Sequence, residues 1–502
     1  MVAGREGIWL GTGSSLDVGK GAAMSALALL GAFGTLFVAG YGLLTLLVRR
    51  ETRFSLTEQI AFSWLLGTGA VSLLLWIFGL LVHGALLPAL VSIVCLLLGF
   101  TGWRRMVPLP VGSAPKSFEI FLGIIIVIEI AVVFYLSFVH TLGWDGLLNW
   151  EIKAHYAFAN GGVIPATYFS DSGRAFSHPE YPLAIPFTEL WLYLWLGEAD
   201  QFWAKTIFPI FYVIGTFLLV GLGRRFTGKT WIGLLMAAFL FFVPQITVEV
   251  GSAIAGYADF PLGIFYLATI GCLFCATEPK NDAFFRLYAA CLALLPWVKR
   301  DGLILWIVAA ACGIFVILRT KRSSRHFLAL FPGLLIVCGW RFYLSAMHAP
   351  QAADFLPMNL ETFSSHLDRV LPLFSALWAE FHNLPTWSLF WFVVAVGVAY
   401  LLGQMRNPGA PVLLTALFVP IMLYLLIYVF SSWPNYLEHV GLSISRLLLH
   451  VAPVGFLITL LAVSRRRVKS PAPVHERGVT CTIAVSERTP VVELAGGNRP
   501  FA

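Results

Sequence analysis

The sequence predicts an all-α polytopic membrane protein, a bundle with about 13 transmembrane helices. Hydrophobic residues make up 59% of the 502 residues and charged residues only 12%, and the mean hydropathy is +0.82. A water-soluble domain carries about 25% charged residues, because its surface must be solvated. The apolar residues come in runs of about 20, and helices of that length satisfy their own backbone hydrogen bonds in lipid.

The spans follow from these apolar runs, taken in chain order. A continuous run after residue 22 is too long for a cleavable signal peptide, so we expect it to be retained. The expected spans are residues 22–48, 59–81, 83–101, 119–141, 201–222, 229–250, 257–276, 284–298, 302–318, 326–346, 386–404, 411–431 and 443–464.

The charged residues between these spans predict the sides of the membrane. Basic residues concentrate in short loops, which is the positive-inside pattern of cytoplasmic loops. Loops 142–200, 350–385 and 432–442 then lie on the outer, periplasmic face of a cell inner membrane, with the N-terminus outside and the C-terminus cytoplasmic. The net charge of +7 is therefore a topology signal and indicates no nucleic-acid partner. The loop cations are Arg49, Arg50, Arg53, Arg104, Arg105, Lys116, Arg224, Arg225, Lys229, Arg319, Lys321, Arg322, Arg325, Arg465, Arg466, Arg467 and Lys469.

Three regions organise the chain. Residues 1–118 form an N-terminal three-span unit, 119–464 a catalytic transmembrane domain, and 465–502 a polar, disordered cytoplasmic tail. Within loop 142–200 we expect interfacial helices. Segment 183–197 is short and carries a glutamate, so we place it on the outer surface with its Trp and Tyr side chains at headgroup depth.

Outer-side charges are the candidate functional residues. Asp145 follows a hydrophobic span directly, and in a helix Asp145, Asn149 and Lys153 share one face because they are four residues apart. Farther along, His178, Glu180 and Tyr181 lie in FSHPEYPL, where two prolines stiffen the backbone. The alternative for both segments is a solvated loop whose charges keep it wet.

Later segments add further candidates. Asp259 begins a span in GYADFPL, where its alternative role is a helix cap. Lys299 and Arg300 occupy an outer turn against the positive-inside bias, and two adjacent cations suit a phosphate; a reversed topology is the alternative. His439 and Arg446 lie at the outer mouth of the last span, where a snorkelling arginine is the alternative. Glu129 lies mid-span, as either a proton-relay residue or an interhelical contact.

The order of these segments resembles bacterial members of the GT-C glycosyltransferase superfamily, which includes aminoarabinose and protein O-mannosyl transferases. The resemblance runs from about Trp144 to Pro453. It comprises WD after an outward span, HPEYPL in the same loop, GYADFPL opening a later span, the turn from Lys299 to Gly302, and SRLLLHVAP. The first three spans have no counterpart in it.

The resemblance implies residue roles. Asp145 is then the catalytic carboxylate of the first outer loop, and Lys299, Arg300 and Arg446 bind the phosphate of a polyprenyl-phosphate-linked sugar. We expect Glu180 to share the catalytic role. The expected substrate-binding residues are Asn149, Lys153, His178, Tyr181, Asp259 and His439.

This chain departs from the family pattern at two places. WDG stands where many members have paired acidic residues, and Arg300 and Asp301 replace commoner residues in the later turn. Family members vary in their need for a divalent cation, so the sequence leaves the cofactor open. The membrane supplies lipid partners, and the sugar, the acceptor and the oligomeric state are not indicated.

The expected function is transfer of a sugar from the lipid-linked donor to an acceptor on the outer side, with inversion. The leading alternative is a transporter or lipid flippase, which favours symmetric halves and polar sites near the bilayer midplane. A non-catalytic scaffold is the second alternative, but it has no use for a Lys-Arg pair on the outer side.

Overall fold

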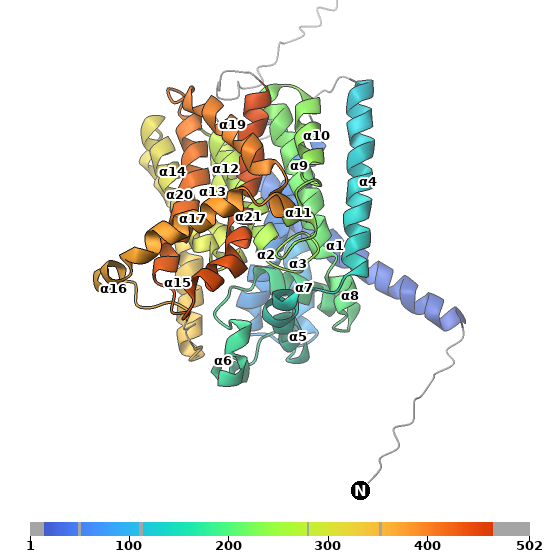
Figure 1. The fold of residues 1–502 in the computed structure, drawn as a ribbon. Helices are drawn as coiled ribbons and strands as arrows, with labels where there is room; N and C mark the ends of the chain where they lie inside the picture. Colours follow the sequence, from blue (N-terminus) through green and yellow to red (C-terminus); the bar gives the residue numbers. More distant parts are fainter. Residues whose placement is uncertain (1–14, 49–51, 110–113, 279–280, 351–353, 465–502) are drawn as a thin grey trace, which may run out of the picture. The chain divides into compact units, whose positions relative to one another are not determined.

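Helices dominate the computed structural model, which describes residues 15–48, 52–109, 114–278, 281–350 and 354–464 (Figure 1). Within these ranges the only β-type pairing is an isolated antiparallel bridge between Phe355 and Ser431. The all-α prediction is therefore confirmed for the described residues. The expected cytoplasmic tail and the basic residues Arg49 and Arg50 lie outside them.

Nine helices in the described ranges are long and apolar enough to cross a membrane, which confirms a polytopic membrane protein. The other expected spans correspond to shorter helices, so the expected total of about 13 spans is not confirmed. The nine are α1 (Ser15–Leu47), α2 (Leu56–Gly79), α3 (Leu86–Trp103), α4 (Ser117–Val139), α8 with α9 (Gln201–Ala204 and Ile207–Thr227), α14 (Gly302–Arg319), η3 with α15 (Ser324–Leu330 and Phe331–Ala346), α20 (Gly409–Val429) and α21 (Tyr436–Val463). The shorter four are α10 (Thr230–Phe239), α12 (Asp259–Cys275), α13 (Asp282–Val298) and α19 (Phe390–Leu402).

The span expected at 229–250 is the clearest difference from the sequence prediction. Helix α10 ends at Phe239, and an irregular segment containing only the short α11 (Pro244–Thr247) leads to α12. Pro244 pushes the preceding residue into an extended conformation and stops the helix. The Gln245 side-chain amide donates to the carbonyl of Val250 at 2.6 Å, so the irregular backbone is partly satisfied from within.

Segment 183–197 was expected on the outer surface, and its helix α7 (Ala184–Leu196) is instead enclosed by protein. Trp191 and Tyr193 are fully buried, and the Trp191 indole donates to the carbonyl of Ala32 on α1 at 3.1 Å. A helix that is apolar on every side is buried, whether in lipid or in protein. The other helices of this loop are η1 (Gly146–Glu151), α5 (Ile152–Ala159), α6 (Ala166–Ser170) and η2 (Ser172–Ser177).

An amphipathic helix of the interfacial type occurs instead in the segment between α15 and α19. Helix α17 (Val370–Phe381) exposes Leu371, Phe374 and Trp378 on one face and buries Leu373 on the other. In Figure 1 it runs across the direction of α20 and α4. Exposed apolar side chains on one face suit a helix that lies in the membrane interface. Its short neighbours are α16 (Leu360–Ser365), η4 (Leu367–Arg369) and α18 (Leu384–Trp387).

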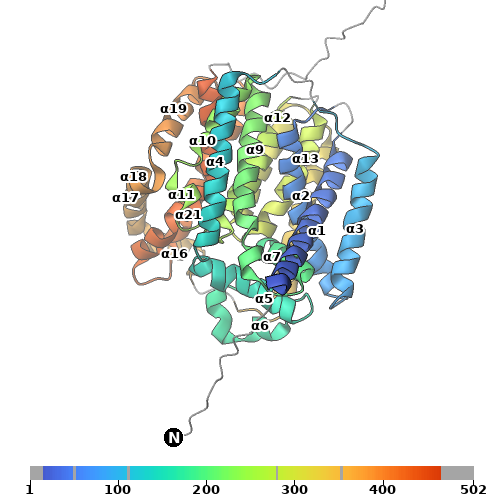
Figure 2. The ribbon, with the colours of Figure 1, turned by 90° about the vertical axis from the view of Figure 1, so that its right-hand side faces the viewer.

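The first three helices pack side by side and join the later bundle mainly through α1 and α2 (Figure 2). Glu58 at the start of α2 accepts two hydrogen bonds from the Arg225 guanidinium on α9, at 2.7 and 2.8 Å. The Glu58 side chain is 2% exposed. Helices on both sides of the domain boundary expected at residue 118 are thus in direct contact.

Candidate functional site

The segment that carries Asp145 lies against the irregular segment before α12. The Gly143 amide donates to the carbonyl of Ala255 at 2.8 Å, and the Asp145 amide donates to the Tyr257 hydroxyl at 3.1 Å. A Cβ atom on Gly146 would lie 2.6 Å from the Ala255 oxygen, so only glycine permits this approach. Directly after Asp145 the chain forms the π-helix η1, a conformation that is frequent at functional sites.

Asp259, the first residue of α12, is the centre of a buried charge network. Its Oδ1 lies 2.7 Å from Lys299 Nζ and 3.0 Å from His450 Nε2, and its Oδ2 lies 3.1 Å from Arg446 Nη2. The Asp259 side chain is fully buried, where a carboxylate needs paired charges and hydrogen bonds. Its role therefore exceeds that of a helix cap.

Arg446 connects this centre to Asp145. The same Nη2 atom lies 2.7 Å from Asp145 Oδ2, and the guanidinium stacks 4.6 Å from the Tyr257 ring centroid. Asp145, Asp259 and Lys299, which are far apart in sequence, therefore belong to one network. The structure thus brings together the acidic residue after α4 and the cation that follows α13.

Lys299 is already neutralised within the network. Its Nζ lies 2.7 Å from both Asp259 and Asp301, and its side chain is 5% exposed. Burial alone would lower the pKa of Lys299, but these two carboxylates hold that pKa above its usual value. Burial would likewise raise the pKa of Asp301, and Lys299 holds it below its usual value. Lys299 as arranged here positions two carboxylates, and its expected contact with phosphate stays a prediction.

Glu180 is the centre of a second, more open group. Its Oε1 lies 3.3 Å from Arg300 Nη1 and 3.4 Å from His178 Nδ1, and its carbonyl accepts from the Trp340 indole at 2.9 Å. The His178 ring stacks on Tyr181 with centroids 4.6 Å apart. Burial would raise the pKa of the Glu180 carboxyl, but the hydrogen bond and charge of His178 hold it below its usual value.

Lys153 forms no ion pair with Glu180 or Asp145, although it is close enough for both charges to act on it. It is fully buried, donates to the carbonyl of Asn149 at 2.7 Å, and lies 5.4 Å from the Tyr181 ring centroid. Burial lowers the pKa of Lys153 to about 7, although the charges of Glu180 and Asp145 oppose the shift. Asn149 Oδ1 is also buried and has no hydrogen-bond partner.

A cleft of about 480 Å³ opens beside the second group, between the Glu180 segment and α15. Arg341 of α15 is exposed, and no ion pair joins it to another residue in the described part of the chain. A volume of this size lies within the range of ligand sites, about 300–1,000 Å³. The lining residues are Glu180, Arg300, Arg341, Leu344, Ser345, His348, Ala349 and Pro350.

Two candidate residues lie apart from both groups. His439 Nδ1 lies 3.0 Å from Ser431 Oγ, and its ring stacks on Trp433 with centroids 4.7 Å apart. Glu129 is buried in α4, where neither carboxylate oxygen has a hydrogen-bond partner. Neither side chain contacts Asp145 or Asp259 in the described structure.

Three network residues and one cleft residue are additions to the sequence prediction. Asp301, His450 and Tyr257 all lie inside motifs that carry the resemblance. Their position in these motifs was the sequence feature that could have identified them as candidates. Arg341 has no such signal, because it is a single cation in an apolar run and only the fold places it beside Glu180.

The carboxylates of the network do not fit a divalent cation as arranged. Asp145, Asp259 and Asp301 each already contact the guanidinium or ammonium group of Arg446 or Lys299. Among the described residues no group of three or more His, Cys, Asp or Glu side chains is placed to share a metal ion. A metal would have to replace these cations rather than join them.

Comparisons with family models, with curated proteins and with solved structures each find no match to this chain. The fold and the site by themselves define a polytopic α-helical membrane protein with a charged network near one end of α4. The resemblance to GT-C enzymes depends on the order of short motifs and on the residues they contain.

Proposed function

We propose that this protein is an integral membrane glycosyltransferase that takes its sugar from a polyprenyl-phosphate donor. The observation that carries the proposal is the juxtaposition of the Asp145 network with a cationic cleft. Sugar transfer needs a carboxylate to accept the proton of the attacking hydroxyl and cations to stabilise the leaving phosphate. The Asp145 network supplies the carboxylate, and the cleft supplies the cations.

The charges divide the site into two halves. Around Asp259, three carboxylates (Asp145, Asp259, Asp301) face two cations, Lys299 and Arg446, which leaves one negative charge in surplus.

In the cleft, Arg300 and Arg341 face the single carboxylate of Glu180, which leaves one positive charge in surplus. A dianionic phosphate favours the cleft, and a sugar hydroxyl favours Asp145. This assigns the phosphate to Arg300 and Arg341, with Lys299 and Arg446 as positioning residues.

The reaction is a single inverting displacement. The acceptor oxygen forms a bond to the anomeric carbon, the bond from that carbon to the phosphate oxygen breaks, and its electron pair stays with the phosphate. Asp145 accepts the proton of the attacking hydroxyl. Its Oδ2 is paired with Arg446, so Oδ1 acts as the base, and the side chain is 20% exposed. Such a base contributes about 10²–10⁴-fold.

The lipid and the topology complete the proposal. The prenyl chain lies along α15, which exposes Leu335 and Phe342 near the cleft. The short helices α10, α12, α13 and α19 complete about 13 spans, with the outer loops on the periplasmic side of the inner membrane and the C-terminus in the cytoplasm.

One observation favours the alternative, a transporter or flippase. Glu129 is a buried, unpartnered carboxyl group in the middle of a span, as a proton-coupled carrier requires. The Asp259 network and the Glu180 group, by contrast, lie near the end of α4 that carries Asp145, and the sequence has no evident symmetric halves. Glycosyl transfer therefore accounts for more of the charged residues.

Comparison of envelope glycolipids tests the proposal in cells. Deletion of the gene should remove one glycosylated product, and the wild-type chain and Glu198→Gln should restore it, because Glu198 is an exposed acid of the same loop. Asp145→Asn should be expressed in the membrane without restoring the product. Restoration by Asp145→Asn would refute the catalytic role.

A further inference from the structure

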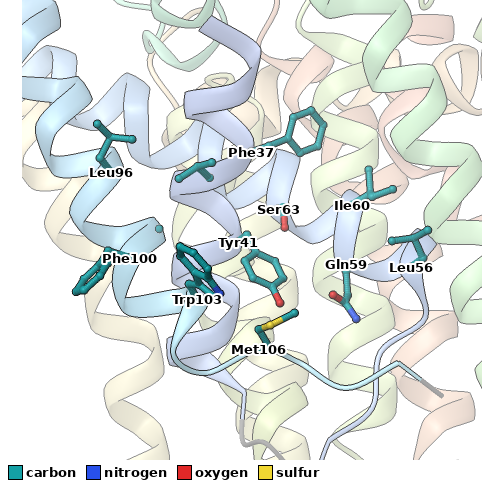
Figure 3. A pocket seen from close by; sticks show the side chains of 12 residues that line it. Phe37, Tyr41, Leu56, Gln59, Ile60, Ser63, Leu96, Phe100, Trp103 and Met106 are labelled. Carbon is teal, nitrogen blue, oxygen red and sulfur yellow. The ribbon is translucent and has the colours of Figure 1, made fainter. Parts of the chain in front are cut away.

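A second concave site lies among α1, α2 and α3 (Figure 3). It is at the end of these helices opposite to Asp145. The groove has a volume of about 640 Å³. It includes the C-terminal half of α3, where the chain turns into α4, whereas Asp145 follows the far end of α4. The lining residues are Phe37, Val38, Tyr41, Leu56, Gln59, Ile60, Ser63, Leu96, Gly99, Phe100, Trp103 and Met106.

Glycines hold together the three helices that line the groove. A Cβ atom on Gly40 of α1 would lie 1.7 Å from the Ser63 carbonyl oxygen of α2. One on Gly102 of α3 would lie 2.7 Å from the Cα atom of Gly42 on α1. Helix α1 therefore packs closely against both neighbours. In Figure 3, α2 and α3 flank α1, and the labelled Tyr41 and Ser63 lie near the centre of the view.

Two polar side chains of the groove, Tyr41 and Gln59, are hydrogen-bonded within the protein. The Tyr41 hydroxyl accepts from the Val107 amide at 3.2 Å, and the Gln59 amide donates to the Val107 carbonyl at 3.4 Å. Apolar side chains such as Leu96, 58% exposed, and Phe100, 54% exposed, form the walls. The interior therefore offers a ligand mainly apolar contact.

Two arginines, Arg104 and Arg105, lie in the chain between Trp103 and Met106, which line the groove. The Arg104 guanidinium lies 4.8 Å from the Phe100 ring centroid, and Arg105 is exposed beside it. Trp103 is 73% exposed, as is typical of tryptophan at a membrane interface. Exposed arginine at headgroup level attracts anionic lipids.

We propose that this groove binds one phospholipid with an anionic headgroup, its acyl chain beside Leu96 and its phosphate at Arg105. The apolar interior and the neighbouring arginines favour an amphipathic anionic ligand over a zwitterionic or a fully polar one. The site is independent of glycosyl transfer. It gives the N-terminal helices, which have no counterpart in the resemblance, a binding role.

Native mass spectrometry of the purified full chain tests the proposal, with phosphatidylglycerol and phosphatidylcholine of identical chains as probes. Leu96→Trp fills the groove and should weaken phosphatidylglycerol binding about tenfold or more. Leu97→Trp is the matched control, because Leu97 is 59% exposed on the same helix and does not line the groove. Arg105→Gln should remove the preference for phosphatidylglycerol, and Lys116→Gln, outside the groove, should keep it.

Three results would overturn the proposal. Equal lipid binding by Leu96→Trp and Leu97→Trp would exclude the groove as the site. Equal binding of the two lipids by the wild-type chain would exclude headgroup recognition. A dimer that Leu96→Trp converts to a monomer would show that a second copy occupies the groove.

Discussion

At the scale of single residues, Lys153 has the environment with the clearest measurable consequence. Its folded-state pKa of about 7 lies below the ordinary value of 10.5, so the unfolded chain binds this proton more tightly between those pH values. Stability should therefore rise with pH across that window, by as much as about 1.4 kcal/mol per pH unit.

Thermal unfolding of Lys153→Met between pH 7 and pH 10 tests this directly. The variant should lose the upward slope, because methionine fills a similar volume without a titrating group. Lys116→Met, at an exposed position, should keep the slope. An unchanged slope in Lys153→Met would assign the pH dependence to another group.

Arg341 provides the residue-scale test of the phosphate position. Arg341→Gln removes a charge-assisted contact and should lower kcat/KM for the lipid-linked donor about 10–100-fold, mainly through KM. Arg325→Gln, at the opposite end of the η3–α15 segment, should leave kcat/KM unchanged. An effect of Arg325→Gln equal to that of Arg341→Gln would remove the basis for the cleft assignment.

Single residues also show how far sequence reasoning extends. Asp145 and Lys299 stand out because a charge beside an apolar span is costly unless it is paired. Arg446 pairs with Asp145 and also with Asp259, which lies 187 positions earlier in the chain. No local pattern in the sequence specifies which of these charges meet. The sequence therefore predicted four members of the network (Asp145, Asp259, Lys299 and Arg446), but not Tyr257, Asp301 and His450 and not the pairing of the charges.

At the scale of elements, the close approach of η1 to the segment before α12 depends on Gly146. Gly146→Ala places a Cβ atom against the Ala255 carbonyl, and backbone cannot yield as a side chain can. We expect a loss of about 1–3 kcal/mol of stability together with most of the transfer activity. Gly441→Ala on α21 meets nothing within 4 Å and should change neither the melting temperature nor the product yield. Normal activity in Gly146→Ala would show that this approach is dispensable.

Two elements show why hydropathy alone fails at this scale. Helix α7 and a membrane span give the same apolar signal, because protein interior and lipid both exclude polar side chains. The irregular segment after α10 is equally apolar, and the local cue was Pro244. Length identifies a long span reliably, whereas burial inside the bundle depends on packing that sequence does not display.

At the scale of the whole molecule, the Glu58–Arg225 pair joins the first three helices to the later bundle. Glu58→Gln leaves a buried guanidinium without its counter-charge and should destabilise the protein by about 3–5 kcal/mol, measured as a fall in melting temperature. Glu119→Gln is the matched control. Like Glu58, Glu119 accepts a hydrogen bond from the amide of the residue before its helix, here Lys116. It is more exposed than Glu58 and forms no ion pair in the described structure. The double variant Glu58→Met with Arg225→Met should recover most of the loss. A melting temperature of Glu58→Gln equal to wild type would show that the pair is not a clamp.

Release of polyprenyl phosphate by the purified, reconstituted protein tests the central claim most directly. With a cell-envelope extract supplying the acceptor and a panel of donors radiolabelled in the sugar, the wild-type chain and Glu198→Gln should release the lipid phosphate from one donor at equal rates. Asp145→Asn should lower that rate by about 10²-fold or more. Release at the wild-type rate by Asp145→Asn, or no release from any donor by the wild-type chain, would contradict the account.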